Sequence, residues 1–228
     1  MTAIAIFVKT PGLSAVKSRL ARTVGTRTAE LCHLRCTQAV AAIAEAARIG
    51  PVYWAIAEDQ ARGHHLWRHR PVLVQPKGCL GTRMQAVHNV LVQRHQRGLL
   101  IGADLPQLEA GDLQRAASWL EQADPRGVIG PATDGGFWLV GANRSLPGVI
   151  WRRPEYGGAT VFDHFLKAAG DSLHWHQLAA RTDLDQIEDV ANVVSELRAL
   201  RCPHEDQRRL INWLATQMTP LKRKPSNE

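Results

Sequence analysis

One loop of the sequence concentrates positive charge directly after an apolar run. Residues 9–20 have the sequence KTPGLSAVKSRL, with the cations Lys9, Lys17 and Arg19 among small hydroxyl residues and one glycine. Backbone N–H groups in such a loop can turn towards phosphate oxygens, while lysine and arginine supply charge. Neither Gly-x-x-x-x-Gly-Lys nor Gly-x-Gly-x-x-Gly occurs there. A phosphate site and a solvated basic loop therefore both remain open.

A single acid follows another apolar run. Asp104 comes two residues after the stretch 98–102. A carboxylate close to a buried sheet is costly unless something pairs with it. A divalent cation is a natural partner, because such ions are held by one or two carboxylates plus phosphate oxygens. The alternative is a helix N-cap, but the next helix is expected nearer Asp112, so the pattern favours a metal ligand.

Two further segments carry polar side chains. Asp134 and Gly135 form a hairpin-turn signal, although the glycines and nearby aromatics could also admit a flat or sugar-like ligand. Residues 183–189 contain four acids. Within them, Asp185 could cap the following helix with Glu188 as its capping-box partner, or could be a second metal ligand. Both interpretations stay open for each segment.

The elements that must position these loops alternate between strands and helices. That alternation predicts βαβ units, a mostly parallel sheet with helices on both faces, and a ligand outside the carboxyl ends of the strands. Strands are expected at 3–8, 52–57, 71–75, 98–102, 127–131, 137–141 and 173–175. Helices are expected at 28–49, 59–67, 82–97, 111–122, 160–169, 186–200 and 205–217.

Composition narrows the class of protein. The chain has 228 residues, 45% of them hydrophobic, and a formal charge of +7, which favours anionic partners. We expect one domain over 1–217 and a disordered basic tail over 218–228. No signal peptide or membrane-length apolar run is evident, which predicts a cytoplasmic protein with no membrane partner. The histidine spacing does not suggest zinc, and Cys32 and Cys36 are expected to be buried, reduced thiols.

Five motifs in order carry a family resemblance. They are Lys9-x-Pro11 with Val16-Lys17-Ser18-Arg19-Leu20; Gly78-x-x-Gly81-x-Arg83-Met84; Ile101-Gly102-x-Asp104-x-Pro106; Gly130-Pro131-Ala132-x-Asp134-Gly135-Gly136; and Asp183-x-Asp185 with Glu188-Asp189. The set resembles the DUF2064 family of GT-A-fold, glycosyltransferase-like proteins. It is also similar to 2-phospho-lactate guanylyltransferases and molybdenum-cofactor guanylyltransferases. The resemblance spans about residues 3–195.

The resemblance implies a fold and a set of roles. The fold would be a nucleotide-diphospho-sugar transferase-like, three-layer α/β/α sandwich with a mixed, mostly parallel sheet. Mg²⁺ or Mn²⁺ would be held by Asp104, Asp185 and Asp183, with Lys17 and Asp104 as the catalytic pair. Asp134, Gly135 and Gly136 would line the acceptor side. The implied nucleotide-binding residues are Lys9, Pro11, Gly12, Lys17, Ser18, Arg19, Gly81 and Arg83. The family often has glycine in place of Ser14 and an acid in place of Cys79, and residues 151–160 fit it poorly.

We therefore expect a metal-dependent transferase with a nucleotide-sugar donor and a small-molecule acceptor. One alternative is a nucleotidyltransferase that joins an NTP to a small phosphorylated acceptor and releases pyrophosphate. Another is a non-catalytic nucleotide-binding protein. Nucleic acid is a less favoured partner, because basic residues and aromatics are not interleaved.

Overall fold

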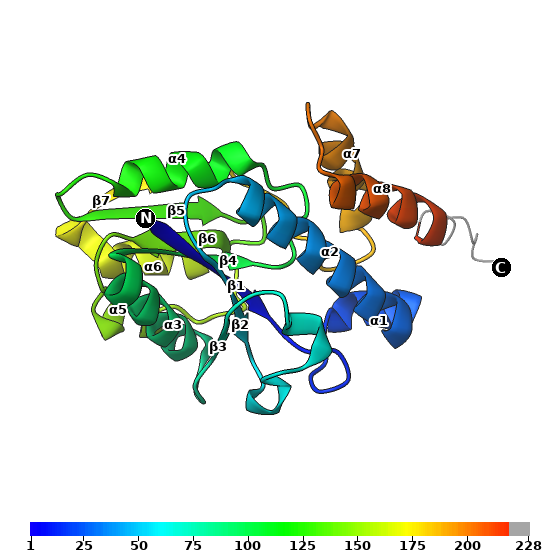
Figure 1. Cartoon of the computed structure of the whole chain (residues 1–228), viewed down its shortest axis with the longest axis horizontal. Helices are drawn as coiled ribbons and strands as arrows, with labels where there is room; N and C mark the ends of the chain where they lie inside the picture. Colours follow the sequence, from blue (N-terminus) through cyan, green and yellow to red (C-terminus); the bar gives the residue numbers. More distant parts are fainter. Residues whose placement is uncertain (219–228) are drawn as a thin grey trace.

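The computed structural model of the chain describes residues 1–218. The expected basic tail lies outside the described residues, apart from Met218. A seven-stranded sheet runs through the molecule in the order β3-β2-β1-β4-β6-β5-β7 (Figure 1). Only β6 is antiparallel to its neighbours, β4 and β5. The strands are β1 (Thr2–Val8), β2 (Val52–Ile56), β3 (Val72–Val74), β4 (Arg97–Gly102), β5 (Arg126–Pro131), β6 (Phe137–Ala142) and β7 (His174–Gln177).

Helices cover both faces of the sheet, so the predicted mixed α/β sandwich is confirmed. Three short 3₁₀ turns also occur, η1 (Asp59–Ala61), η2 (His65–Trp67) and η3 (Gly170–Ser172). The α-helices are α1 (Ser18–Val24), α2 (Thr26–Ala46), α3 (Leu80–His95), α4 (Ala110–Leu120), α5 (Gly148–Arg152), α6 (Val161–Ala169), α7 (Asp189–Ala199) and α8 (Glu205–Gln217).

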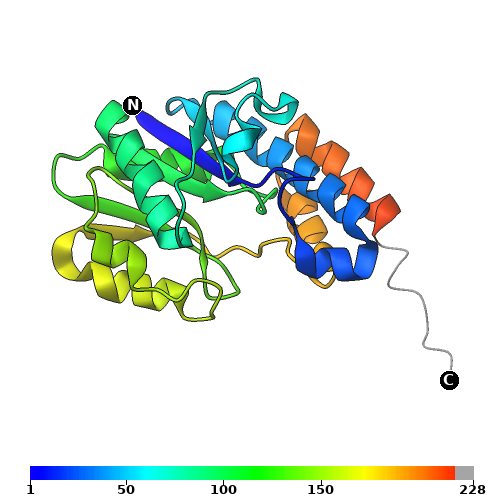
Figure 2. The same cartoon turned by 90° about the horizontal axis from the view of Figure 1, so that it is seen from below.

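The central strand β1 shows why the sheet is covered twice. Six of its seven residues are buried, as expected of a strand with helices on both sides. Side chains alternate between the faces: Ile4 and Ile6 pack in the core under α2 and α4, whereas Ala3 and Ala5 face α3, α5 and α6. Figures 1 and 2 show these two layers on opposite sides of the strands.

A third apolar cluster lies beyond the sheet. It joins α1 and α2 to α7 and α8, and Leu20, Leu184, Leu197 and Leu210 are all completely buried within it. Both views place these four helices together at one end of the molecule (Figure 2). The cluster therefore brings the start of the chain and its C-terminal third to the same place.

Most predicted elements are present, with shifted ends. The segment expected as one helix over 59–67 forms two 3₁₀ turns instead, η1 and η2. The short helices α1 and α5 were not predicted, and α1 begins inside the segment expected as a loop over 9–20. The five residues of α5 are too few for a clear helical period. Among residues 1–218, no helix combines the length and hydropathy that a membrane crossing requires.

Candidate functional site

Lys17 lies at the centre of the site. It precedes α1 and has left-handed backbone angles, φ 43° and ψ 48°, which residues other than glycine rarely adopt. Its side chain is only 1% exposed. The ammonium donates to Asp104 Oδ1 at 2.6 Å and to the backbone oxygen of Leu184. Lys17 thus joins three segments that are far apart in the sequence.

The loop before Lys17 is held by buried polar contacts. Thr10 is fully buried; its N–H donates to Glu58 Oε2 at 3.0 Å, and its hydroxyl accepts from Trp67 Nε1 at 3.0 Å. The N–H groups of Leu13 and Ser14 both donate to the Thr10 oxygen and form the turn. Because the residue before η1 and the end of η2 supply these partners, the loop has a fixed path to α1.

Asp104 follows β4 and caps no helix. The N-cap of α4 is Glu109, which forms a capping box with Asp112, so the N-cap alternative for Asp104 is wrong. The Asp104 side chain is 36% exposed, and His33 Nδ1 lies 3.8 Å from its Oδ1. His33 also contacts the Lys9 oxygen at 3.1 Å. The carboxylate is thus held from the buried side and remains accessible from the other.

The acidic segment is fixed beside Asp104. Leu184 N donates to the backbone oxygen of Asp104 at 3.0 Å, and Gln107 Nε2 donates to the backbone oxygen of Thr182 at 2.7 Å. The backbone N–H groups of Asp185 and Gln186 both donate to Asp189 Oδ2. Capping by Asp185 with Glu188 is therefore the wrong assignment: α7 begins at Asp189, and Asp189 is the carboxylate that binds the turn.

The carboxylates of the site influence one another electrostatically. Burial would raise the pKa of Asp104, but the Lys17 charge, together with His33, holds that pKa well below its usual range. For Lys17, burial opposes the charged form, yet Asp104 and the nearby Cys36 and Cys32 sulfurs outweigh it and raise the pKa. Burial, followed by the charges of Asp104, Asp134 and Asp185, raises the pKa of Asp183 to about 7. Burial is thus the main reason that Asp183 holds its proton, and the neighbouring carboxylates add to it.

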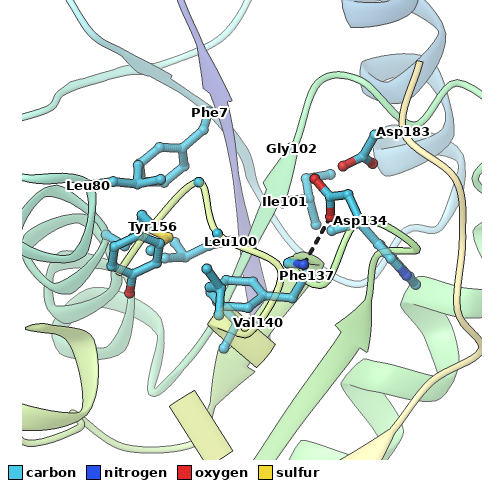
Figure 3. Close-up of a pocket in the computed structure, with 16 residues that line it drawn as sticks. Phe7, Leu80, Leu100, Ile101, Gly102, Asp134, Phe137, Val140, Tyr156 and Asp183 are labelled. Atoms are coloured by element: carbon cyan, nitrogen blue, oxygen red, sulfur yellow. Dashed lines mark hydrogen bonds between the residues drawn. The ribbon is translucent and has the colours of Figure 1, made fainter. Parts of the chain in front are cut away.

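Two adjoining cavities open at the carboxyl ends of β1 and β4. The first, here called the cationic cavity, has a volume of about 410 Å³. The second, the apolar cavity, has a volume of about 220 Å³ (Figure 3). Phe7 and Leu80 line both, so the cavities share a wall. The ionisable side chains of the cationic cavity are Lys9, Lys17, Arg19, His33, Arg83, Asp104 and Asp185.

The two cavities divide the residues predicted from sequence. Lys9, Lys17, Ser18, Arg19, Arg83, Asp104 and Asp185 line the cationic cavity. Asp134, Gly136 and Asp183 line the apolar cavity instead. Asp183 thus lines the apolar cavity, whereas the two carboxylates with which it was grouped line the cationic one. Pro11, Gly12, Gly81 and Gly135 line neither cavity.

Packing explains two of those glycines. A Cβ at Gly81 would lie 1.9 Å from the Trp151 backbone oxygen, where α3 meets α5. Gly135 has φ +89°, and a Cβ there would lie 1.9 Å from the Ala159 oxygen. Both positions need glycine for close backbone approach, whatever the ligand.

Sequence reasoning missed several residues of the site. Phe7 and Tyr156 line the apolar cavity, while His33 and Gln75 line the cationic one. His33 lies with Cys32 and Cys36 on the buried face of α2. An ionisable residue on the apolar face of a helix was the signal that could have identified it. Tyr156 had no such signal, because its loop has no regular period.

A preformed metal centre is absent from the part of the chain that the structure describes. Within residues 1–218, no three His, Cys, Asp or Glu side chains converge closely enough to hold one ion. Asp104, Asp183 and Asp185 therefore do not form a ready three-carboxylate ligand set. Asp104 and Asp185 still face one cavity, and oxygen donors of this kind suit Mg²⁺ or Mn²⁺.

Comparison with known proteins places the chain in a family. A family model described as an uncharacterized protein conserved in bacteria, DUF2064, matches residues 35–157. The chain belongs to the DUF2064 family. The match includes Asp104 and the Asp134 turn of this DUF2064 protein, but neither the 9–20 loop nor the 183–189 segment. No curated protein matches the sequence.

Solved structures extend the likeness over nearly the whole DUF2064 chain. A candidate nucleotide-diphospho-sugar transferase from Desulfovibrio desulfuricans G20 has a TM-score of 0.83 at 22% identity, covering 96% of this chain and 97% of that one. A nucleotidyl transferase from Methanothermobacter thermautotrophicus has a TM-score of 0.56 at 14% identity, covering 88% and 99%. CMP:2-keto-3-deoxy-manno-octonic acid synthetase complexed with CTP has a TM-score of 0.52 at 11% identity, covering 84% of this chain and 96% of that one. The nucleotide-diphospho-sugar transferase-like fold predicted for this DUF2064 chain is thereby confirmed.

Proposed function

We propose that the chain is a metal-dependent transferase that takes a nucleotide sugar as donor and moves the sugar to a small-molecule acceptor. The observation that carries this proposal is the pair of adjoining cavities, one cationic and one apolar, at the carboxyl ends of β1 and β4. Ligands bind in that position in open α/β sheets. A donor diphosphate suits the cationic cavity, and its sugar would lie where that cavity adjoins the apolar one, at Phe7 and Leu80.

The cations of the first cavity have different tasks. Lys17 already donates to two oxygens and is almost fully buried, so it positions Asp104 and the 183–185 segment. The Arg19 side chain is 58% exposed, and its one contact with a carboxylate, Asp185 Oδ2, is long at 3.6 Å. Its guanidinium can therefore bind a phosphate. Arg83 is oriented by Gln75 Oε1 at 3.3 Å. Lys9, Arg19 and Arg83 are therefore the phosphate-binding candidates, with Lys17 behind them.

The side chains present also fit a hard divalent cation. Asp104 and Asp185 offer carboxylate oxygens to the cationic cavity, and Mg²⁺ is usually held by one or two carboxylates plus substrate phosphates. Burial, and next the charges of Asp104, Asp134 and Asp185, raise the pKa of Asp183 to about 7, and a bound cation would offset the part that comes from those charges. A bound ion would neutralise charge on the departing diphosphate.

In the proposed reaction, the sugar moves from the donor phosphate to a hydroxyl group of the acceptor. The acceptor hydroxyl oxygen bonds to the anomeric carbon as the bond from that carbon to the donor phosphate oxygen breaks. The nucleoside diphosphate leaves with the electron pair. Asp183, which faces the apolar cavity and has a pKa of about 7, can take the hydroxyl proton near neutral pH.

Nucleotidyl transfer is the second candidate. Two of the structural relatives are a nucleotidyl transferase and a synthetase complexed with CTP. The same cationic cavity would then hold a nucleoside triphosphate, an acceptor oxygen would bond to the α-phosphorus, and pyrophosphate would leave. Products separate the two reactions: a nucleoside diphosphate supports glycosyl transfer, and pyrophosphate supports nucleotidyl transfer.

A thermal-shift panel of nucleotide sugars and nucleoside triphosphates, with and without Mg²⁺ or Mn²⁺, tests the proposal before the acceptor is known. A ligand at ~100 times its dissociation constant stabilises the folded state by ~2.7 kcal/mol. We expect such a shift with at least one nucleotide, larger with metal. The substitution Asp104→Asn should remove the metal-dependent part, whereas Asp59→Asn, at a residue 80% exposed, should not. No shift with any nucleotide would reject the proposal.

A further inference from the structure

We propose that the apolar cavity binds the acceptor, and that the acceptor is a small, uncharged alcohol built on one apolar ring. This inference rests on the proposed function, because it names the substrate that would receive the transferred group.

The walls favour an apolar ring over a sugar. Phe7, Phe137 and Tyr156 supply aromatic surface, and Leu100 and Val140 supply aliphatic surface. The Tyr156 hydroxyl donates its hydrogen to the Trp151 oxygen at 2.7 Å, so it can accept from a ligand but cannot donate to one. The several hydroxyls of a sugar would lose water against such walls and gain few partners, which is costly. A hydrocarbon ring has no such hydroxyls, so its burial there breaks no hydrogen bonds.

The polar end favours a neutral hydrogen-bond donor. Asp134 and Asp183 line one side of the cavity, opposite Phe7 and Tyr156, as Figure 3 shows. Asp134 Oδ1 accepts from Gly136 N at 2.9 Å, and its second carboxylate oxygen can accept from a ligand. Carboxylates repel a phosphate or carboxylate group placed beside them. The end therefore accepts a hydroxyl and disfavours an anionic acceptor.

Size and position set the remaining limits. An apolar cavity of ~150 Å³ holds benzene, so about 220 Å³ admits one six-membered ring with a short substituent. The cavity adjoins the cationic one at Phe7 and Leu80. A hydroxyl on that substituent can thus approach a donor whose diphosphate occupies the neighbouring cavity.

Two glycines allow the cavity to be filled without disturbing its walls. Gly102 lies at the end of β4, and a Cβ added there meets no atom within 4 Å. Gly158 lies in a separate loop, and a Cβ there has its nearest contact at 3.4 Å, with the Glu155 oxygen. Neither has a left-handed φ. Gly102→Leu and Gly158→Leu therefore fill the cavity from two walls, and Gly111→Leu on α4 is a matched control outside it.

The experiment measures ligand binding by NMR for benzyl alcohol, cyclohexylmethanol and D-glucose, alongside the nucleotide thermal shift on the same samples. We expect both ring alcohols to bind at least about tenfold more tightly than glucose. Each filling variant should weaken ring-alcohol binding by a similar factor, with Gly111→Leu unchanged. In Gly158→Leu the nucleotide shift should be retained.

Two outcomes overturn the inference: glucose binding as tightly as the ring alcohols, or ring-alcohol affinity unchanged in both filling variants. The failure of the proposed function would look different. In that case no nucleotide would stabilise the wild-type chain, while ring-alcohol binding and its loss in the variants would persist and support the cavity assignment alone.

Discussion

At the scale of single residues, the site depends on a buried lysine that holds an exposed acid in place. The Lys17 ammonium contacts both Asp104 and the Leu184 oxygen, and only the Asp104 end of this arrangement reaches solvent. Removing one partner of a buried ion pair leaves an uncompensated charge, which costs more than removing both. Stability and binding should therefore respond differently to the two partners.

We predict that Lys17→Met lowers the free energy of unfolding by about 2–4 kcal/mol, towards the low end of what breaking buried pairs costs because Asp104 is partly exposed. The double variant Lys17→Met with Asp104→Asn should recover part of that loss. Urea denaturation of the two variants and wild type measures it. Equal stability of Lys17→Met and wild type would contradict the ion-pair assignment.

The pKa of Asp183 leads to a second prediction, for protein in metal-free buffer. The folded state keeps the Asp183 proton up to about pH 7, whereas the unfolded chain releases it near pH 4. Because the unfolded state binds fewer protons between those values, this residue lowers stability as pH rises through that window. Asp183→Asn should raise the melting temperature by a few degrees at pH 8 and leave it nearly unchanged at pH 4. Melting curves from pH 4 to 8 decide this, and a variant less stable at pH 8 would disprove the assignment.

At the scale of elements, close backbone approach determines where glycine is required. Gly81 lets the start of α3 pack against the Trp151 oxygen of α5. We predict that Gly81→Ala destabilises the fold by roughly 1–3 kcal/mol through overpacking. Gly111→Ala, at a half-buried position of α4 where an added Cβ would meet only the Arg115 side chain at 3.5 Å, should be neutral or gain up to ~1 kcal/mol from helix propensity. Thermal unfolding compares them; a fully stable Gly81→Ala with weakened nucleotide binding would instead indicate a ligand contact.

Elements with a clear period were predictable from sequence, and contacts across loops were not. β1 and α8 carry strong apolar patterns and were expected close to their actual bounds. Asp104 could be selected because a carboxylate after a buried strand is unusual. In contrast, α7 begins at Asp189 because the 183–189 segment turns on hydrogen bonds to that carboxylate. Several acids lie within reach of that turn, so the sequence does not indicate which one binds it.

The sequence also did not indicate that Asp183 and Asp185 line different cavities. The two lie two positions apart in the acidic motif, yet Asp183 lines the apolar cavity and Asp185 the cationic cavity. The boundary between these cavities is made by Phe7 and Leu80, which come from other parts of the chain. Only the folded arrangement of β1 and α3 could show on which side each acid lies.

At the scale of the whole molecule, the C-terminal helices hold the loop that carries Asp104. Gln207 on α8 is 1% exposed, and its Nε2 donates to the oxygens of Pro106 at 2.8 Å and Leu108 at 3.0 Å. These contacts link residues about a hundred positions apart. The third apolar cluster thus supports the site as well as the fold.

We predict that Gln207→Leu destabilises the protein by about 1–3 kcal/mol, since two buried carbonyl oxygens lose their donor. The melting temperature should fall by roughly 2–4 °C for each kcal/mol in a chain of this size. Gln93→Leu, on the exposed side of α3, is the matched control and should change little. Unchanged melting of Gln207→Leu would show that α8 does not hold the Asp104 loop.

The most direct test of the account is an anomalous-diffraction map of crystals grown with Mn²⁺ and the nucleoside diphosphate whose base matches the nucleotide with the largest thermal shift. The account predicts a manganese peak beside the Asp104 carboxylate, with the diphosphate in the cationic cavity within reach of Arg19. A nucleotide bound elsewhere on the molecule, with no manganese near Asp104, would contradict it.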